Sequence, residues 1–161
     1  MNELTLKEQT FCHLGNSNLL LIESVRNPVK LSRVYNKPDG GLWACVYTPS
    51  NTYRSEWEAW CEMDDFKHYD PDNYFIFRLA ESAKILVINS VEDYENIDSM
   101  YKNENGTLNW DILPNFYDGV YVGRSHGYWV CNCNFDHPAF SLEGWDVKSI
   151  VIFRNSAIVS V

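Results

Sequence analysis

Three short apolar segments of the chain each carry one side chain that a strand buried in a core does not need. The first carries an imidazole at His13, the second an indole at Trp43 behind two glycines, and the third a carboxylate at Asp118. Imidazole and carboxylate side chains hydrogen-bond to ligands and move protons, and a flat indole face stacks on ligand rings. These three residues are therefore the candidates for a functional site.

The residues that follow His13 favour contact with a ligand. An imidazole on an apolar strand is most often a core or edge residue satisfied by one hydrogen bond. Here Gly15, Asn16 and Ser17 come directly after the strand. Glycine lets a ligand approach the backbone closely, and the two polar side chains offer donors in a tight turn. Both interpretations of His13 remain open.

Trp43 and Asp118 also have ordinary structural interpretations. A tryptophan buried on a central strand accounts for Trp43, whereas a ligand-stacking role would take its opposite face from Tyr53 and Trp57. An aspartate that caps the turn before a strand accounts equally well for Asp118. The residue types alone do not choose between these interpretations.

In order and strand context the three segments resemble the mono- and poly(ADP-ribosyl)transferase superfamily. The NAD cleft of that superfamily is marked by a histidine, an aromatic residue and a glutamate on three strands. The stretch from Gly41 to Ala44 looks like the glycine–aliphatic–tyrosine–phenylalanine strand of its branch that contains diphtheria toxin and poly(ADP-ribose) polymerases. Two departures stand out: Leu14 is inserted between the histidine and the glycine, and Asp118 stands where the family has glutamate.

The resemblance implies a catalytic pair and a set of residues that bind NAD as substrate. Asp118 would stabilise the ribosyl cation, and His13 would hold the adenosine ribose. The residues implied to contact NAD are His13, Gly15, Asn16, Ser17, Arg33, Trp43, Tyr53 and Trp57. Among them Trp43 would stack on nicotinamide, the backbone after His13 would grip its amide, and Arg33, or alternatively Lys37, would meet the pyrophosphate.

A second likeness is to small phage and bacterial proteins that share four short motifs. In this chain the motifs are Lys37–Trp43, Trp57–Cys61, Tyr117–Gly119 and Trp145–Ser149. This likeness implies a phage-encoded effector that modifies a protein in the host cytoplasm to counter host defence. The function expected from both likenesses is mono-ADP-ribosylation of a macromolecule, most simply a protein. The alternative is a non-catalytic inhibitor that binds a protein through the same fold.

Composition argues against several other classes of function. The 161 residues suit one domain, 1–161, and the net charge of −9 without a basic cluster argues against nonspecific nucleic-acid binding. No apolar run approaches the length that spans a membrane, so no membrane association is expected. Five cysteines without a regular framework and no secretory signal predict free thiols in the cytoplasm.

Two cysteine–histidine arrangements compete with the NAD site. Cys131 and Cys133 with His126 and His137 are suitable zinc ligands, but their spacing is wrong for a zinc knuckle, so no metal site is predicted. A nucleophile drawn from Cys12, Cys45 or Cys61 with His13 or His68 has no local signature.

Hydrophobic patterning predicts many strands with a few helices between them. The expected strands are Phe11–Leu14, Leu42–Tyr47, Tyr74–Leu79, Ile85–Ile88, Gly119–Val122, Tyr128–Cys131, Ile150–Phe153 and Ala157–Val161. The expected helices are one opened by a capping box at Ser55 and running to about Phe66, one at Val91–Lys102, and a short helix or turn at Asn109–Phe116. Without regular βαβ alternation this indicates an α+β fold. The resemblance further implies a split β-sheet, formed by two packed sheets.

Overall fold

Short runs of β-branched and aromatic residues between turn signals form the strands of the protein. The computed structural model describes residues 1–15, 21–30, 32, 35–49, 52–66, 70 and 72–161. The strands in these residues are β1 (Thr10–Leu14), β2 (Leu42–Val46), β3 (Tyr74–Leu79), β4 (Ile85–Ile88), β5 (Gly119–Val122), β6 (Ser149–Ile152) and β7 (Ile158–Ser160).

The helical segments are short and lie between the strands in sequence. The α-helices are α1 (Glu3–Lys7), α2 (Glu56–Met63), α3 (Val91–Glu95) and α4 (His126–Asn132). The 3₁₀ segments are η1 (Ser99–Tyr101), η2 (Leu113–Asn115), η3 (Pro138–Gly144) and η4 (Asn155–Ala157). In the described part of the chain no helix is long and apolar enough to cross a membrane.

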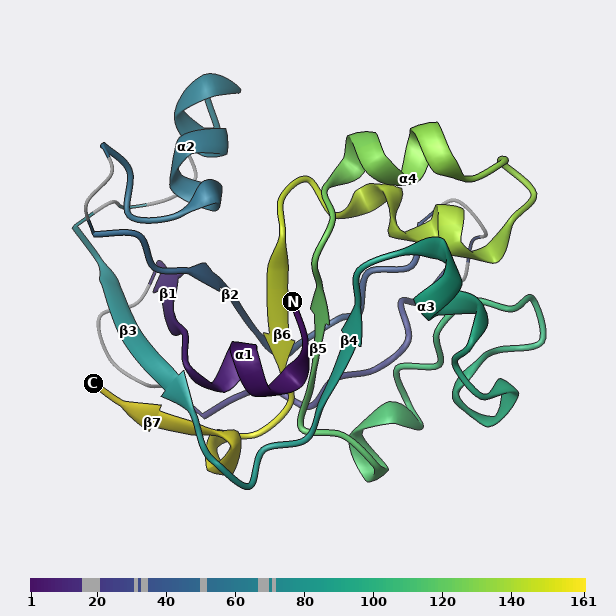
Figure 1. Ribbon diagram of the computed structural model, residues 1–161, viewed down its shortest axis with the longest axis horizontal. Helices are drawn as coiled ribbons and strands as arrows, with labels where there is room; N and C mark the ends of the chain where they lie inside the picture. Colours follow the sequence, from purple (N-terminus) through teal and green to yellow (C-terminus); the bar gives the residue numbers. More distant parts are fainter. Residues whose placement is uncertain (16–20, 31, 33–34, 50–51, 67–69, 71) are drawn as a thin grey trace.

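The described strands form one curled sheet in the order β4-β5-β6-β2-β1-β3-β7. Among these described strands β4 and β5 run parallel, and the other neighbouring pairs are antiparallel. In Figure 1, β4, β5 and β6 form one wing and β1, β3 and β7 the other, with β2 between them. The α+β class is confirmed, and the two expected sheets are hydrogen-bonded into one.

The sheet forks between its two wings. β1 and β2 pair only through Phe11 with Val46 and Cys12 with Cys45 among their described residues. Beyond these pairs β1 continues along β3, where His13 lies opposite Phe75. Residues 42–44 of β2 pair instead with β6, which lies on the opposite side of β2 from β1. The two strands therefore diverge at His13.

A glycine turn delivers the chain into β2. Gly40 and Gly41 have φ of 78° and 79°, in the left-handed region that favours glycine. A Cβ on Gly40 would lie 2.5 Å from the backbone oxygen of Ser24. Arg26 and Asp39 exchange backbone hydrogen bonds of 3.1 Å just before this turn. The backbone contacts of this turn therefore exclude a side chain at Gly40.

The core lies on both faces of the central strands. Val120 and Val122 belong to the cluster under α3, α4 and η3, whereas Tyr121 faces the cluster that contains α1 and β3. On β6, Val151 and Ile150 divide between the same two clusters. Successive side chains of a strand point to opposite faces, so both faces of β5 and β6 are covered. These two strands form a fixed support for the segments beside them.

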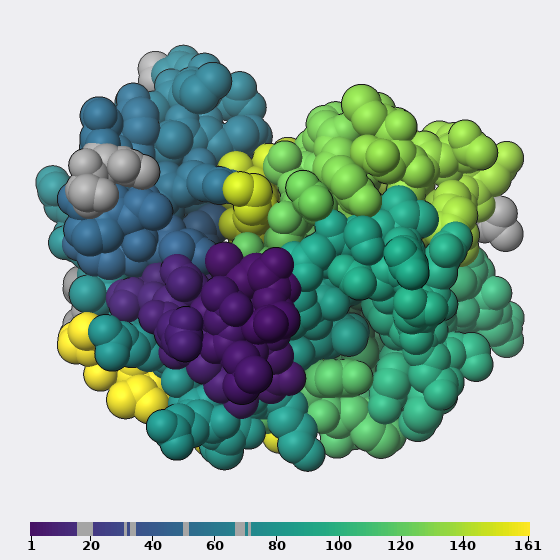
Figure 2. Space-filling model, viewed as in Figure 1, coloured from purple at the N-terminus to yellow at the C-terminus, as the bar shows by residue number. Residues whose placement is uncertain are grey.

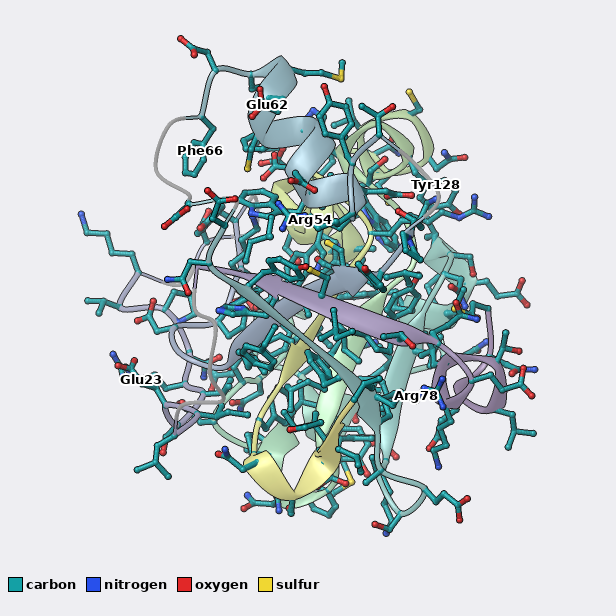
Figure 3. All side chains as sticks on the ribbon, turned by 90° about the vertical axis from the view of Figure 1, so that its left-hand side faces the viewer. Glu23, Arg54, Glu62, Phe66, Arg78 and Tyr128 are labelled. Carbon is teal, nitrogen blue, oxygen red and sulfur yellow. The ribbon has the colours of Figure 1, made fainter. Side chains whose placement is uncertain are left out.

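Helix α2 stands off the sheet on a polar base (Figure 3). Ser55 caps it by accepting a hydrogen bond of 3.2 Å from the backbone N–H of Glu58, which confirms the predicted start. Glu58 in turn accepts from the backbone N–H of Arg54 at 2.6 Å and pairs with its guanidinium. That guanidinium lies 4.2 Å from the ring centroid of Tyr74 on β3, and hydrogen bonding to it lowers the pKa of Glu58. The base of α2 is thereby held to the β1–β3 wing.

Two predicted elements are corrected by the structure. The strand expected at Tyr128–Cys131 is part of helix α4, where Trp129 is buried while Val130 and Cys131 are exposed. Trp129 and Cys133, four residues apart, both contribute to the core, which is helical rather than alternating spacing. The helix expected at Val91–Lys102 is interrupted between α3 and η1, because the side chain of Asp98 accepts from the backbone N–H of Met100 and starts a new turn.

Candidate functional site

A cavity of about 200 Å³ opens at the divergence of β1 and β2. We call it the fork pocket. Its lining consists of residues 12–14 of β1, residues 43–45 of β2, Trp57 of α2, Lys37, residues 145–147, and Ser149 at the start of β6. Figure 2 shows a notch between α2 and α4, with residues of the C-terminal third at its base. Strands that are distant in sequence thus meet around one cavity.

The walls of the fork pocket are aromatic. The rings of Trp43 and Trp145 have centroids 5.2 Å apart at an interplanar angle of 49°. Trp57 enters from α2, where it stacks on Trp60 at 4.8 Å. Pockets of about 300–1,000 Å³ enclose drug-sized ligands, so this smaller cavity suits one flat ring system. The remainder of a longer ligand would lie outside it.

His13 closes the fork through its own side chain. Its Nδ1 lies 2.7 Å from the carbonyl oxygen of Trp43, and because a carbonyl only accepts, Nδ1 carries the proton and donates. Burial lowers the pKa of His13 below its ordinary value, and the hydrogen bond to Trp43 offsets part of this effect. His13 is therefore a neutral imidazole near pH 7, with Nε2 as an acceptor.

The lowered pKa of His13 predicts a loss of stability in acid. Below the ordinary histidine pKa of about 6.5 the unfolded chain binds a proton that the folded chain does not, so unfolding becomes easier. His13→Asn keeps a side-chain N–H for Trp43 but does not titrate. We expect it to reduce the stability lost between about pH 7.5 and about pH 5.5 by up to about 1 kcal/mol, as measured by urea unfolding. An equal loss in both proteins would contradict this prediction.

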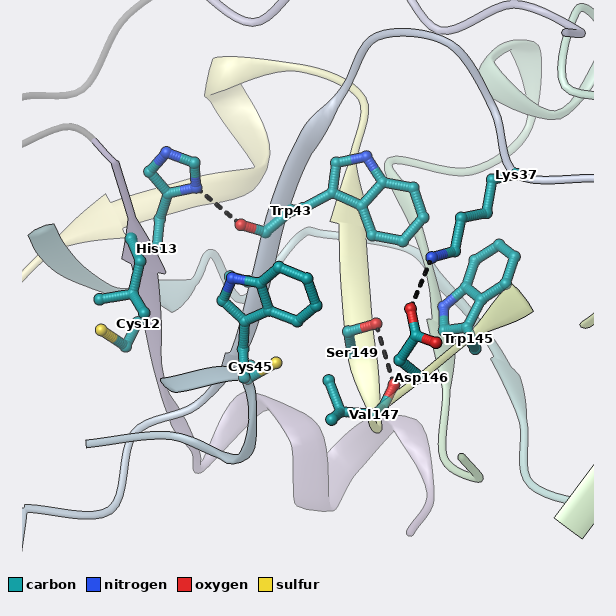
Figure 4. A pocket seen from close by; sticks show the side chains of 12 residues that line it. Cys12, His13, Lys37, Trp43, Cys45, Trp145, Asp146, Val147 and Ser149 are labelled. Atoms are coloured by element: carbon teal, nitrogen blue, oxygen red, sulfur yellow. Dashed lines mark hydrogen bonds and ion pairs between the residues drawn. The ribbon is translucent and has the colours of Figure 1, made fainter. Parts of the chain in front are cut away.

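An ion pair lies beside the aromatic wall. Lys37 Nζ is 3.3 Å from Asp146 Oδ2, and it lies 5.8 Å from the Trp43 ring centroid and 6.0 Å from that of Trp145. Figure 4 shows Lys37, Trp145 and Asp146 on one side of the pocket and Cys12 and His13 on the other. The pocket therefore holds a carboxylate and a cation, each partly exposed.

The carboxylate in the fork pocket is Asp146, and the predicted Asp118 lies elsewhere. Asp118 comes just before β5, and Gly119 pairs with Ile152 at the far end of β6 from Ser149. A four-residue strand spans roughly 13 Å, which separates Asp118 from the pocket. Its Oδ2 accepts from the backbone N–H of Lys84 at 2.9 Å, and its Oδ1 pairs with Arg154 Nε at 3.2 Å. Asp118 therefore fastens strand ends together, and its predicted place in the cleft is corrected.

The other predicted contact residues divide into three groups. His13, Trp43 and Trp57 line the fork pocket together, whereas Gly15 and Tyr53 do not. Gly15 donates its N–H to the oxygen of Asn73 at 2.7 Å and accepts from the side-chain amide of Asn73 at 3.1 Å, so its backbone is engaged in the sheet. The predicted Asn16, Ser17 and Arg33 lie outside the described residues.

The cysteines near the pocket are unsuited to nucleophilic attack. Burial raises the pKa of the Cys12 and Cys61 thiols to about 11 and that of Cys45 to about 12. A thiol with such a pKa is almost entirely protonated near pH 7, and the thiolate is the nucleophile. The cysteine–histidine alternative that includes His13 therefore lacks an activated thiol, and His68 lies outside the described residues.

The zinc alternative is not supported by the positions of its donors. His126 Nδ1 pairs with Glu143, and His137 Nε2 lies 3.1 Å from Glu95. Cys131 is exposed on α4. Among the described residues, no group of three or more histidine, cysteine, aspartate or glutamate side chains could hold a metal ion.

Sequence reasoning missed the residues that lead into β6. Trp145, Asp146 and Ser149 lie in a motif that the sequence marked only as a likeness, without a role in a site. The sequence feature that could have identified them is the presence of polar and aromatic residues just before a fully buried strand. It became meaningful only through the pairing of β6 with β2, which brings Val151 opposite Trp43.

Comparisons with protein-family models, curated proteins and solved structures gave no match to this chain. The fold and the cavity define an α+β protein with an aromatic pocket at a fork in its sheet. A function for this pocket therefore has to be argued from its own residues.

Proposed function

We propose that the chain binds NAD with the nicotinamide end in the fork pocket and transfers the ADP-ribose unit to a protein. The observation that carries this proposal is the meeting of three neighbouring strands, β1, β2 and β6, around one cavity. They bring to it an imidazole at His13, an indole at Trp43 and, just before β6, a carboxylate at Asp146. These are the three kinds of group that mark the NAD cleft of the family that the sequence resembles.

The dimensions and walls of the pocket suit one end of NAD. A cavity of about 200 Å³ between Trp43, Trp57 and Trp145 takes a single flat ring, and indole faces stack on such rings. The ribose and phosphates would then extend past Lys37, whose ammonium can meet the pyrophosphate. His13, on the other side of the pocket, would contact a ribose hydroxyl.

Asp146 takes the catalytic role that the resemblance led us to expect of Asp118. In the reaction the bond between ribose C1′ and the nicotinamide nitrogen breaks, and its electron pair leaves with neutral nicotinamide. A nucleophile of the target protein then bonds to C1′ and releases its proton. The ribosyl group becomes cationic in between, and a nearby carboxylate stabilises that charge. Engagement of Lys37 by the pyrophosphate would turn Asp146 toward the ribose.

A reducing compartment fits this proposal. The five cysteines are all free, and three of them are buried, on β1, β2 and α2. Free buried thiols are typical of proteins that work in the cytoplasm. We therefore infer action on a cytoplasmic protein, which would be a host protein if the chain is encoded by a phage.

The experiment for this proposal is transfer from labelled NAD. The purified protein is incubated with a bacterial lysate and NAD labelled in its adenylate part. We expect label on protein and release of one nicotinamide for each label transferred. The absence of both label and nicotinamide would rule out the proposed reaction under those conditions.

One observation favours the alternative, a non-catalytic protein-binding role. Helix α2 projects from the sheet and presents an aromatic cluster, in which Phe66 contacts Trp57 and Trp60 at centroid distances of 5.8 and 5.7 Å. Met63 on the same helix is 83% exposed, and Glu62 lies toward the end of the helix away from its base (Figure 3). An apolar surface among carboxylates suits a basic partner protein. Calorimetry discriminates, because this role requires no heat of NAD binding.

A further inference from the structure

One buried donor at the fork pocket has no acceptor. Trp145 is 1% exposed, and its Nε1 finds no hydrogen-bond partner among the described residues. The two other fully buried tryptophans are satisfied: Trp110 donates to the oxygen of Asn36 at 2.9 Å and Trp129 to that of Arg124 at 3.2 Å. A buried indole N–H normally has a partner, so the exception at Trp145 calls for an explanation.

The ring of Trp145 is held rigidly at the pocket wall. Trp110 stacks on it at a centroid distance of 6.0 Å and an interplanar angle of 18°, and Trp43 contacts it at 49°. Figure 4 shows its indole nitrogen on the ring edge that faces Asp146 and the cavity. A donor fixed in this way is already oriented before a ligand arrives.

The donor that the resemblance implied for a ligand amide is occupied. The N–H of Gly15 is used by Asn73 at 2.7 Å, and Gly15 does not line the pocket. Trp145 Nε1 is a buried donor of the pocket wall that has no partner among the described residues, so it is open to a ligand acceptor.

We propose that Trp145 Nε1 donates a hydrogen bond to a neutral carbonyl oxygen on a flat aromatic ring bound in the fork pocket. The flat ring follows from the indole walls, and the acceptor follows from the unsatisfied N–H. The acceptor is neutral because the carboxylate of Asp146, which also lines the pocket, would repel a ligand carboxylate. This inference rests on the proposed function, in which the ring is nicotinamide, and it makes Trp145 the residue that distinguishes the carboxamide from other ring substituents.

The test follows the indole N–H signals in NMR spectra of ¹⁵N-labelled protein. Three probes are titrated separately: nicotinamide, nicotinic acid, and 3-methylpyridine, which has no carbonyl. We expect nicotinamide to shift the Trp145 indole signal and to leave those of Trp110 and Trp129 in place. We expect 3-methylpyridine to bind roughly 2–10-fold more weakly, the effect of one lost hydrogen bond. Nicotinic acid should also bind more weakly, because the carboxylate of Asp146 repels its own.

The variant Trp145→Phe keeps an aromatic ring, removes the N–H and identifies the Trp145 signal. It should weaken nicotinamide binding roughly 2–10-fold more than it weakens 3-methylpyridine binding, which uses the ring wall but not the N–H. Should the variant fail to fold, the titration of the unaltered protein decides alone. A Trp145 signal that stays in place at saturating nicotinamide overturns the inference, and so does equal affinity for the three probes.

The outcome is separable from that of the proposed function. If nicotinamide shifts Trp145 but no transfer from NAD occurs, the recognition site stands and the catalytic proposal fails. If transfer occurs while the Trp145 signal stays in place, the reaction stands and the role of Trp145 is refuted.

Discussion

Asp146→Asn is expected to slow nicotinamide release from NAD by roughly 10²–10³-fold, the range found when one charge-stabilising group is removed from an active site. The change removes the negative charge that we propose acts on the ribose, and it keeps the shape of the side chain. The affinity for NAD should change little, because the carboxylate acts on a charge that develops only in the transition state. Release of free nicotinamide and calorimetric binding of NAD measure the two quantities separately.

The fold should tolerate this substitution. Asp146 pairs with Lys37 at 3.3 Å, and both side chains are partly exposed. Pairs of this kind contribute about 0–1 kcal/mol to stability. The melting temperature should therefore stay close to that of the unaltered protein.

Asp118→Asn is the matched control. It makes the same chemical change near the far end of β6. There Asp118 pairs with Arg154 and accepts a hydrogen bond from the backbone N–H of Lys84. We expect it to lower stability and leave the rate of nicotinamide release unchanged. A loss of rate in Asp118→Asn, with normal turnover in Asp146→Asn, would reverse our choice of carboxylate.

The largest effect on stability is expected from Trp110→Ala. Trp110 is fully buried, stacks on Trp145, meets Phe153 edge-on at 6.4 Å and donates to Asn36. Truncating a buried tryptophan costs about 3–5 kcal/mol, because the contacts are lost and a cavity remains. For a chain of this size that lowers the melting temperature by roughly 6–20 °C, which calorimetry or circular dichroism measures.

Met63→Ala provides the comparison for Trp110→Ala. Met63 lies on α2 and is 83% exposed, so its truncation should change stability by no more than about 0.5 kcal/mol. Equal melting temperatures for Trp110→Ala and the unaltered protein would show that the core beneath the pocket is not packed as described.

The strands were predictable because their signals are local. Tyr74–Leu79, Ile85–Ile88 and Gly119–Val122 have the predicted bounds. Each is a continuous apolar or aromatic run between polar or glycine-containing turns. The segment at residues 128–131 was predicted wrongly, because a short aromatic run is equally typical of a strand and of one turn of helix.

Local sequence signals could not show which carboxylate lies near His13 and Trp43. Asp118 stands before a true strand, as the resemblance required, but β5 is separated from β2 by β6. Which strand lies next to β2 depends on pairing between segments about a hundred residues apart, and consecutive strands are neighbours only about two-thirds of the time. His13 and Trp43 line one pocket, as expected, because β1 and β2 are neighbours both in sequence and in the sheet.

The most direct measurement is a titration of ¹⁵N-labelled protein with NAD, followed through assigned backbone amide signals. Binding at the fork predicts saturable shifts at His13, Trp43, Ala44 and Ser149, with the signals around Asp118 unmoved. No saturable shift, or shifts confined to the strand ends around Asp118, would contradict NAD binding between β1 and β2.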